Sequence, residues 1–330
     1  MSFIILIASL ILILLGANYL TDGAAAVARR YGISDMVVGL TIVALGTSAP
    51  EFIVSLMSAL HGSSDMAIGN VVGSNLFNTL AIVGVTALIT PIHVDRGTLS
   101  KDLPLNLLAC VVLAACANDI LLDAAEVNSI SRVEGIMFIG LFLIFLRHTF
   151  SLASEGVDGN QEAEKTFSEG EKRTSEGEKG FSRLRCFFYI LGGLVALIVG
   201  GNWFVESASA IARMMGVEES IIALTLMAGG TSLPELATSV VAARKGNVDM
   251  AIGNVIGSNI FNIFLILGVC SCVTPLGVGN IGNLELLTLV LSGLLLWFTG
   301  QFYRERTVTR IEGALMLGVY VGYTALLILR

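Results

Sequence analysis

The chain consists of long apolar blocks separated by short polar breaks. Blocks such as 3–15 and 284–299 approach the roughly 20 residues that a helix needs to cross the ~30 Å hydrocarbon core of a bilayer. The pattern therefore predicts an all-α integral membrane protein. The ten predicted transmembrane helices lie at about residues 3–22, 33–60, 66–89, 102–118, 132–149, 186–206, 217–243, 250–273, 284–300 and 311–329.

Two segments of the chain are repeated almost without change. VVGLTIVALGTSAPEFIVSL from Val37 recurs as IIALTLMAGGTSLPELATSV from Ile221, and SSDMAIGNVVGSNLFN from Ser63 recurs as NVDMAIGNVIGSNIFN from Asn247. All matches keep one offset, 184 residues, and 28 of 56 positions from residue 37 onward are identical without a gap. The same register extends back to the pairs Gly16/Gly200 and Asp22/Glu206. We interpret this as a gene duplication.

Five predicted helices separate each element from its copy. Because five is odd, the two copies cross the membrane in opposite directions, which is a recurring arrangement in secondary transporters. We therefore expect a first five-helix repeat over 1–150 and a second over 186–330. The stretch between them, 151–185, is rich in charged residues, Gly and Ser and predicts a flexible linker.

The composition supports a membrane protein and narrows its partners. The chain is 55% hydrophobic and 14% charged, whereas soluble domains carry roughly a quarter charged residues. A net charge of -7 without a basic stripe argues against nucleic acid as a partner. The five cysteines form no CxxC pair and are interpreted as small buried hydrophobes. The first apolar block has no basic n-region and is interpreted as a retained helix rather than a signal peptide.

Lysine and arginine are distributed unevenly between the loops. If the linker is cytoplasmic, both termini lie outside and 16 of the 19 basic residues lie on the cytoplasmic side. Only Arg132, Arg213 and Arg330 then remain outside. Because cytoplasmic loops carry the excess of Lys and Arg, the chain is expected in the inner (cell) membrane in this orientation.

Two glutamates, Glu51 and Glu235, lie deep inside apolar blocks. An ionisable group at that depth is costly and marks a functional site by default. Each follows the motif Gly-Thr-Ser-x-Pro, whose proline lacks an N–H and clashes with the carbonyl four residues earlier. The helices are therefore expected to open near Gly46 and Gly230, where freed backbone groups are tolerated only beside a cavity or other protein groups.

Hydroxyl and amide side chains accompany both glutamates. Together they form the ligand set of hard cations such as Ca²⁺ and Na⁺, without the thiolate or imidazole that zinc or copper prefers. Two glutamates would neutralise one Ca²⁺ or two Na⁺. The accompanying residues are Thr47, Ser48, Ser74, Asn75 and Asn78 in the first repeat, and Thr231, Ser232, Ser258, Asn259 and Asn262 in the second.

These motifs resemble the alpha-repeats of the calcium/cation antiporter superfamily, which includes sodium/calcium exchangers. The resemblance rests on Gly46-Thr-Ser-Ala-Pro-Glu51, on Gly69-Asn-Val-Val-Gly-Ser-Asn75 and on their copies, and it covers the whole membrane region. It implies ten helices, alternating access and exchange of Ca²⁺ against Na⁺ without a resident cofactor. The residues that it implies as ion ligands are Ala44 and Ala228 through their carbonyls, with Thr47, Ser48, Glu51, Ser74, Asn78, Thr231, Ser232, Glu235, Ser258 and Asn262.

One position departs from part of that family. Some members carry an Asp where this chain has Asn262, and that Asp is associated with K⁺ co-transport or with protonation. With Asn at both 78 and 262, the resemblance favours exchange without K⁺, and coupling to protons rests on the two glutamates. A Ca²⁺/H⁺ antiporter that uses the same site is the alternative. The chain also lacks the large cytoplasmic calcium-sensing domains of animal exchangers, so that regulation is not expected.

Other polar residues have simpler interpretations. Asp65 and Asp249 precede apolar blocks and are interpreted first as N-terminal helix charges. Asn70 and Asn254 are as compatible with hydrogen bonds between helices as with ion contact. Asp22 and Glu206 favour an interfacial or helix-packing role.

Two other classes of protein also place carboxylates in a membrane. An intramembrane hydrolase would need a nucleophile or metal motif, and none accompanies the glutamates. An oxygen-lined channel would conduct cations without a counter-ion, whereas an exchanger would not. Ca²⁺, Na⁺, possibly H⁺, and membrane lipid are the expected partners, with no obligatory protein partner evident.

Overall fold

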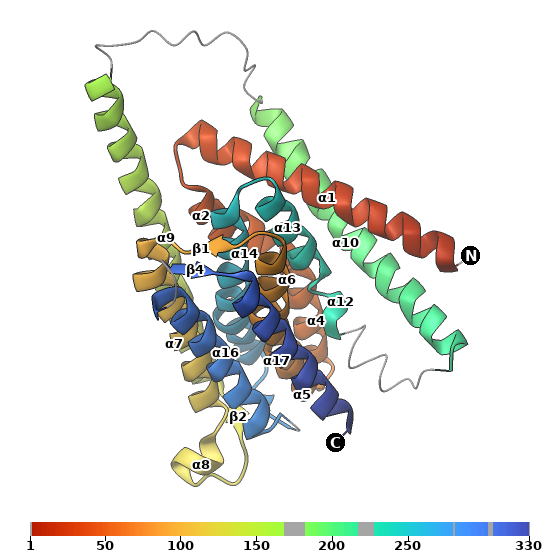
Figure 1. Cartoon of the computed structure of the whole chain (residues 1–330). Coiled ribbons are helices and arrows are strands. Elements are labelled where there is room, and N and C mark those ends of the chain that lie inside the picture. Colours follow the sequence, from red (N-terminus) through yellow and green to blue (C-terminus); the bar gives the residue numbers. More distant parts are fainter. Residues whose placement is uncertain (1, 168–181, 217–227, 280, 303–305, 330) are drawn as a thin grey trace.

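The computed structural model describes residues 2–167, 182–216, 228–279, 281–302 and 306–329. Helices make up nearly all of them, as the apolar blocks predict (Figure 1). The helices of the first half, with η marking π-helical segments, are α1 (Ser2–Tyr31), α2 (Asp35–Val38), η1 (Gly39–Val43), α3 (Ala44–Thr47), α4 (Ala49–Leu60), α5 (Ser64–Leu76), η2 (Phe77–Ile82), α6 (Val83–Ile89), η3 (Thr98–Asp102), α7 (Leu103–Cys116), α8 (Asp119–Asp123) and α9 (Arg132–Phe167).

The described helices of the second half follow a similar order. Its π-helical segment starts 184 residues after η2, so both copies widen the helix at the same point. The described helices are α10 (Arg183–Met214), α12 (Ala228–Gly230), α13 (Leu233–Arg244), α14 (Val248–Ile260), η5 (Phe261–Leu267), α15 (Gly268–Val273), α16 (Asn283–Phe302) and α17 (Arg310–Leu329).

Eight helices of the described residues are long and apolar enough to cross a bilayer. The pair Asp35–Thr47 and Ala49–Leu60, which is bent by 47°, makes nine if it is counted as one broken span. The predicted helix 217–243 begins outside the described residues, and its described part consists of α12 and α13. The all-α membrane fold is therefore confirmed, whereas the count of ten helices stays a prediction.

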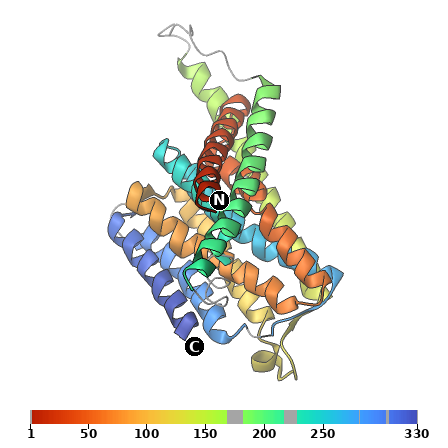
Figure 2. The same ribbon diagram turned by 90° about the vertical axis from the view of Figure 1, so that its right-hand side faces the viewer.

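Helices α1 and α10 form an antiparallel pair on one side of the molecule (Figures 1 and 2). As residue numbers rise along α1, the partners on α10 fall: Ile13 lies against Gly200, and Gly16 against Leu197. A Cβ atom on Gly193 would lie 2.6 Å from the backbone nitrogen of Leu20, so only glycine allows this close crossing. The opposite directions of α1 and α10, equivalent helices of the two repeats, are those of an inverted repeat.

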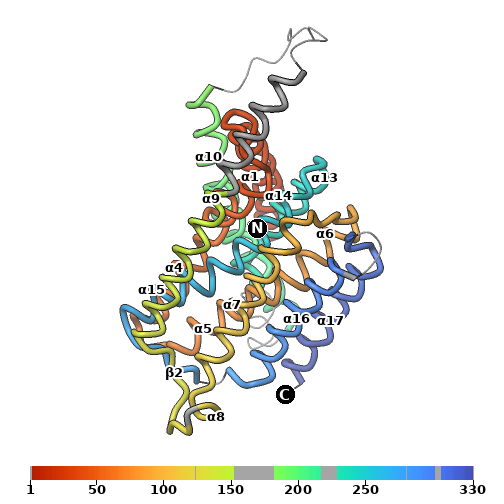
Figure 3. The backbone as a smooth tube through the Cα atoms, turned by 90° about the vertical axis from the view of Figure 1, so that its left-hand side faces the viewer, coloured from red at the N-terminus to blue at the C-terminus, as the bar shows by residue number. Residues whose placement is uncertain are grey.

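The rest of the molecule has the same twofold logic. Helix α17 packs on α6 as α9 packs on α15, and α7 packs on α16 (Figure 3). Two short antiparallel strand pairs close the loops: β1 (Ile92–His93) with β4 (Thr307–Val308), and β2 (Ser129–Ile130) with β3 (Leu276–Gly277). β1 and β3 are 184 residues apart, so each strand of one repeat pairs with a strand of the other. These pairings fasten the two halves together at both ends.

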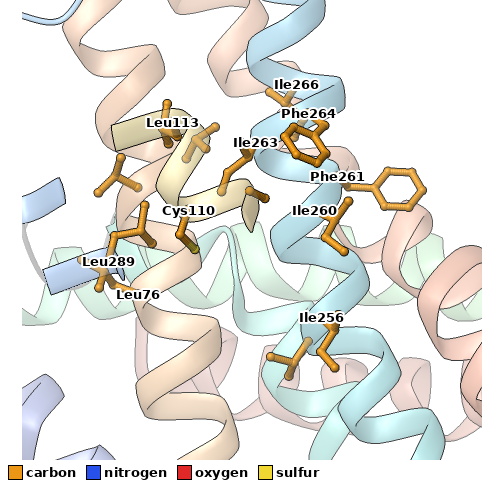
Figure 4. Packing of buried hydrophobic residues seen from close by; sticks show 14 of the residues in the cluster. Leu76, Cys110, Leu113, Ile256, Ile260, Phe261, Ile263, Phe264, Ile266 and Leu289 are labelled. Carbon is orange, nitrogen blue, oxygen red and sulfur yellow. The ribbon is translucent and has the colours of Figure 1, made fainter. Parts of the chain in front are cut away.

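The main apolar core is built from both repeats. It lies between the inner helices α4–α6 and α13–α15 and the surrounding helices α7, α9, α16 and α17. Leu76 of α5, Cys110 of α7, and Ile260 of α14 belong to one buried cluster, with Phe264 of η5 beside them (Figure 4). Because the middle of α5 and of α14 is buried in this cluster, polar residues there, such as Ser74, Asn75, Ser258 and Asn259, are cut off from water and are expected to find partners inside the protein.

Helix α9 continues to Phe167, well past residue 149, where the fifth predicted helix ends. Residues 151–167 of the predicted flexible linker are therefore helical, in keeping with the good helix formers Glu, Ala and Lys at 162–165. The remainder of the linker, 168–181, lies outside the described residues. The boundaries of the repeats stay predictions.

Candidate ion-binding site

Each glutamate stands in the first turn of a helix that restarts inside the protein. Helix α3 ends at Thr47 and α4 begins at Ala49, with Pro50 in its first turn. In the second repeat α12 ends at Gly230 and α13 begins at Leu233, again with a proline in the first turn. The sequence motif predicts these breaks. They place both carboxylates at helix N-termini, where unpaired N–H groups favour negative charge.

The two broken helices exchange hydrogen bonds through their glutamates. The Ser48 hydroxyl donates to Glu235 Oε1 at 3.1 Å, and the Ser232 hydroxyl donates to Glu51 Oε1 at 2.8 Å. Ser74 adds a longer bond to the same Glu51 oxygen, at 3.5 Å. Each repeat therefore supplies the serine that holds the carboxylate of the other repeat, and both carboxylates lie where the two broken helices meet.

Both carboxylates are cut off from solvent and from basic side chains. Glu51 is 1% exposed and Glu235 is 0% exposed. Within the described residues, neither has a lysine, arginine or histidine partner within 4.0 Å. The second oxygen, Oε2, of each glutamate makes no hydrogen bond to the protein. Buried charge without a partner is strongly unfavourable, so these oxygens call for a cation or a proton.

Further oxygen atoms of the predicted set are buried and without a hydrogen-bond partner among the described residues. Asn78, Ser258 and Asn262 lie on α5–η2 and α14–η5, the helices that pack against the glutamate-bearing helices, and Thr231 lies in the break between α12 and α13. The unpartnered atoms on predicted residues are Asn78 Oδ1, Thr231 Oγ1, Ser258 Oγ and Asn262 Oδ1.

The two threonines of the motif differ in their surroundings. Thr47 Oγ1 lies 3.1 Å from the carbonyl of Val43 and 3.2 Å from Asn254 Oδ1. Its hydroxyl therefore also ties the broken helix to α14. The hydroxyl of Thr231, its copy, makes no hydrogen bond among the described residues. Only Thr231 presents an unused hydroxyl oxygen here.

The two alanines were expected to contribute carbonyl oxygens. Ala44 begins α3, is buried, and its carbonyl accepts a hydrogen bond from the Ser48 N–H at 3.0 Å. A Cβ atom on Gly257 would lie 2.7 Å from Ala44 Cβ, so α14 approaches this point closely. Ala228 begins α12, and its side chain lies outside what the structure describes.

Asn70 and Asn254 bridge helices rather than pointing to the carboxylates. Asn70 donates to the carbonyl of Glu51 at 3.3 Å and to Ser55 Oγ at 2.9 Å. Asn254 makes the same two bonds to the residues 184 positions further on, at 3.4 Å and 3.0 Å. Of the two interpretations left open for this pair, the structure shows the hydrogen bonds between helices.

A second set of amides links the two repeats. Asn75 donates to the carbonyl of Asn259 at 3.2 Å, and Asn259 donates to Thr79 Oγ1 at 2.8 Å. Asn262 donates to Asn75 Oδ1 at 2.9 Å, which leaves its own oxygen unpartnered. Asn75 and Asn259 belong to the amide residues that the repeated motifs single out, but not to the ligands that the resemblance implies, and in the structure they join the two repeats.

The remaining acids stand apart from this site. Asp65 and Asp249 occupy the first turns of α5 and α14, as helix-terminal charges do. Among the described residues no group of three or more His, Cys, Asp or Glu side chains could hold a metal ion. A cation at the glutamates would therefore draw most of its ligands from hydroxyl, amide and carbonyl oxygens, which suits hard ions.

An inverted repeat with buried carboxylates at the meeting point of two broken helices defines a secondary transporter of cations. The chain belongs to the sodium/calcium exchanger protein family, whose model matches residues 1–150 and 186–329. It is thus a membrane antiporter for cations, and the resemblance seen in the repeated motifs is confirmed.

Similar proteins cover almost the whole chain. It is 33% identical over 326 residues to a putative antiporter, CaxA, of Alkalimonas amylolytica, with 98% of each chain covered. It is also 33% identical over 349 residues to the sodium/calcium exchanger MaX1 of Methanosarcina acetivorans, covering 99% of this chain and 98% of MaX1. A solved structure of the sodium-calcium exchanger NCX_Mj matches with a TM-score of 0.80 at 29% identity, covering 99% of this chain and 98% of that one.

Proposed function

We propose that this protein exchanges Ca²⁺ for Na⁺ by alternating access at the two glutamates. The observation that carries the proposal is the pair of buried carboxylates, Glu51 and Glu235. Each is held by a serine of the opposite repeat, and each keeps one oxygen without a hydrogen-bond partner among the residues that the structure describes. Family membership and the similarity to MaX1 support Ca²⁺ and Na⁺ as the ions.

The proposed ligands surround the carboxylates from both repeats. Ca²⁺ takes six to eight oxygen ligands at about 2.3–2.6 Å, more than the two carboxylates alone provide. The hydroxyl and amide oxygens supply the rest. The proposed set is Glu51 and Glu235 with Thr47, Ser48, Ser74, Asn78, Thr231, Ser232, Ser258, Asn262 and the carbonyls of Ala44 and Ala228.

Charge balance explains how one site serves both ions. Two carboxylates neutralise one Ca²⁺ or two Na⁺, so either load makes the site close to neutral inside the membrane. A site without a cation would carry two buried negative charges, which is costly in a low-dielectric interior. The unloaded protein should therefore not change its access, and this couples the two fluxes. Exchange of more than two Na⁺ per Ca²⁺ would move net charge.

Orientation completes the proposal. With the linker in the cytoplasm, both termini lie outside, and the Lys/Arg-rich loops lie on the cytoplasmic side of the inner membrane. In this orientation Lys245, at the end of α13, faces the cytoplasm, while His61, at the end of α4, faces outward.

The test is ⁴⁵Ca²⁺ uptake into proteoliposomes under an outward Na⁺ gradient, compared with an outward H⁺ gradient. Uptake that requires Na⁺ supports the proposal. Uptake driven by H⁺ alone would assign the same site to a Ca²⁺/H⁺ antiporter, because two protons can also neutralise the carboxylates. Uptake that needs neither ion would contradict exchange.

A further inference from the structure

A lysine outside the ion site ties the α1–α10 pair to the rest of the molecule. Lys245, the residue that ends α13, donates from Nζ to Asp22 Oδ1 at 2.8 Å, to Thr21 Oγ1 at 2.9 Å and to the carbonyl of Asn18 at 3.1 Å. All three acceptors lie on α1. All three N–H donors of the ammonium group are thus used on a single helix. The ion pair with Asp22 is half-exposed.

The repeat offset of 184 assigns a counterpart to each partner. Asp22 corresponds to Glu206 on α10, and Lys245 corresponds to His61, which ends α4 as Lys245 ends α13. The two sets lie at opposite ends of the inverted repeat. If the structure were fully symmetric, Glu206 and His61 would be in contact.

The structure is not symmetric at this point. Helix α1 packs along α13, whereas the described residues show no comparable packing of α10 on α4. His61 Nδ1 lies 2.8 Å from the carbonyl of Met57, within its own helix. Glu206 is exposed and has no hydrogen bond or ion pair among the described residues. The α1–α10 pair therefore packs against α13 at one end of the molecule without an equivalent contact to α4 among the described residues.

In an inverted repeat, this asymmetry predicts which contacts form in the opposite conformation of the transporter. When the two repeats exchange their conformations, each contact of one repeat is replaced by the equivalent contact of the other. The α1–α10 pair would then leave α13 and pack along α4, bringing Glu206 to His61.

We propose that Lys245 is a positioning residue that holds the α1–α10 pair in the arrangement seen here, and that Glu206 and His61 form the equivalent contact in the opposite arrangement. The proposal rests on the proposed exchange cycle, because it gives that cycle two end states. The two contacts differ in chemistry: a lysine with three donors stabilises one state, and an imidazole stabilises the other. The exchanger is therefore biased toward the state with the lysine.

The test measures the two populations directly and needs no transport. Spin labels on cysteines introduced at Arg29 of α1 and Met66 of α5, both exposed, report the position of α1 against the core by pulsed electron paramagnetic resonance, with the five native cysteines replaced by alanine. Lys245→Met should move population away from the present arrangement, changing the ratio of the two distances about two- to fivefold, as expected for exposed ion pairs. Glu206→Gln should move it in the opposite direction.

Three controls separate this role from simple damage. Arg244→Met removes the same charge from the neighbouring position, whose side chain makes no hydrogen bond or ion pair among the described residues, and should leave the ratio unchanged. Lys245→Arg should retain most of the wild-type ratio. His61→Lys strengthens the opposite contact and should act in the same direction as Lys245→Met.

Equal ratios in Lys245→Met and Arg244→Met would overturn the proposal, as would shifts in one common direction for Lys245→Met and Glu206→Gln. Failure of the proposed function has a different signature, since it would appear as absent exchange in the wild-type proteoliposomes while the distance ratios remain measurable.

Discussion

At the scale of single residues, the two glutamates make the sharpest prediction. Glu51→Gln and Glu235→Gln should each reduce Ca²⁺/Na⁺ exchange at least about a hundredfold, because removing one partner from a buried charge pair costs about 3 kcal/mol or more. ⁴⁵Ca²⁺ uptake in proteoliposomes measures this. Glu126→Gln, in an exposed loop, is the matched control and should exchange at the wild-type rate. Wild-type exchange in either glutamate variant would refute the assigned site.

The crossed serines predict a milder and symmetric effect. Ser48→Ala and Ser232→Ala each remove a hydrogen bond to a charged group, worth about 1.5–3 kcal/mol. Each should raise the half-saturating Ca²⁺ concentration about tenfold or more. Ser63→Ala is the control, since that hydroxyl forms no cap hydrogen bond in the loop before α5. Unequal effects of the two serines, with one near wild type, would argue against a site shared between the repeats.

Much of the site can be predicted at this scale, because duplication marks the residues and their depth in apolar blocks marks their cost. A single sequence does not show which of these side-chain oxygens form hydrogen bonds within the protein and which are left for an ion. Thr47 lies within hydrogen-bond distance of Asn254, whereas its copy Thr231 has no hydrogen-bond partner in the part of the chain that the structure describes, although the motif around them is the same. The difference depends on how two distant helices pack, which no local spacing encodes.

At the scale of helices, the glycines at the α1–α10 crossing predict a loss of stability. Gly193→Val would push a side chain into the backbone of α1, and overpacking of this kind costs about 1–3 kcal/mol. Thermal unfolding in detergent should show a lower midpoint. Gly192→Ala, one residue earlier, has open space around its Cβ position and should unfold like the wild type. Matching midpoints for the two variants would show that the crossing is less tight than described.

The helices themselves were largely predictable, and so were their interruptions. Proline after Gly-Thr-Ser places the break before Glu51, and the structure bends there by 47°. The π-helical segments η2 and η5 and the two-residue strand pairs were not predicted. The strand pairs depend on contacts across large sequence separations, since β1 at Ile92 pairs with β4 at Val308. Periodicity within one segment carries no information about such partners.

At the scale of the whole molecule, the proposed orientation predicts which loops are reached from which side. A cysteine in place of Glu126, in an exposed loop, should react with a membrane-impermeant thiol reagent added to right-side-out vesicles. A cysteine in place of Arg96, also exposed, should react only in inverted vesicles. The opposite result for both would reverse the orientation while leaving the fold untouched.

The asparagines at 78 and 262 predict the ion requirement of the whole cycle. Neither Asn78 nor Asn262 adds a third carboxylate to the site, so no negative charge remains to balance a bound K⁺. Replacing K⁺ by choline should therefore leave the rate of Na⁺-driven Ca²⁺ uptake unchanged. A rate that rises severalfold with K⁺ would contradict this and would require a cation ligand beyond the proposed set.

The crossed bonds between Ser48 and Glu235, and between Ser232 and Glu51, have a consequence for the ancestry of this protein. A single ancestral half inserted in both directions and paired as an antiparallel homodimer would already have possessed both crossed bonds. Once two copies were fused into one chain, each half had to insert into the membrane in a single direction. The copies have diverged accordingly at equivalent positions: one carries Leu60 and His61, the other Arg244 and Lys245. In the proposed orientation, these substitutions place basic residues on the cytoplasmic side, and Lys245 at the same time supplies a contact with α1 whose equivalent His61 does not make in this structure.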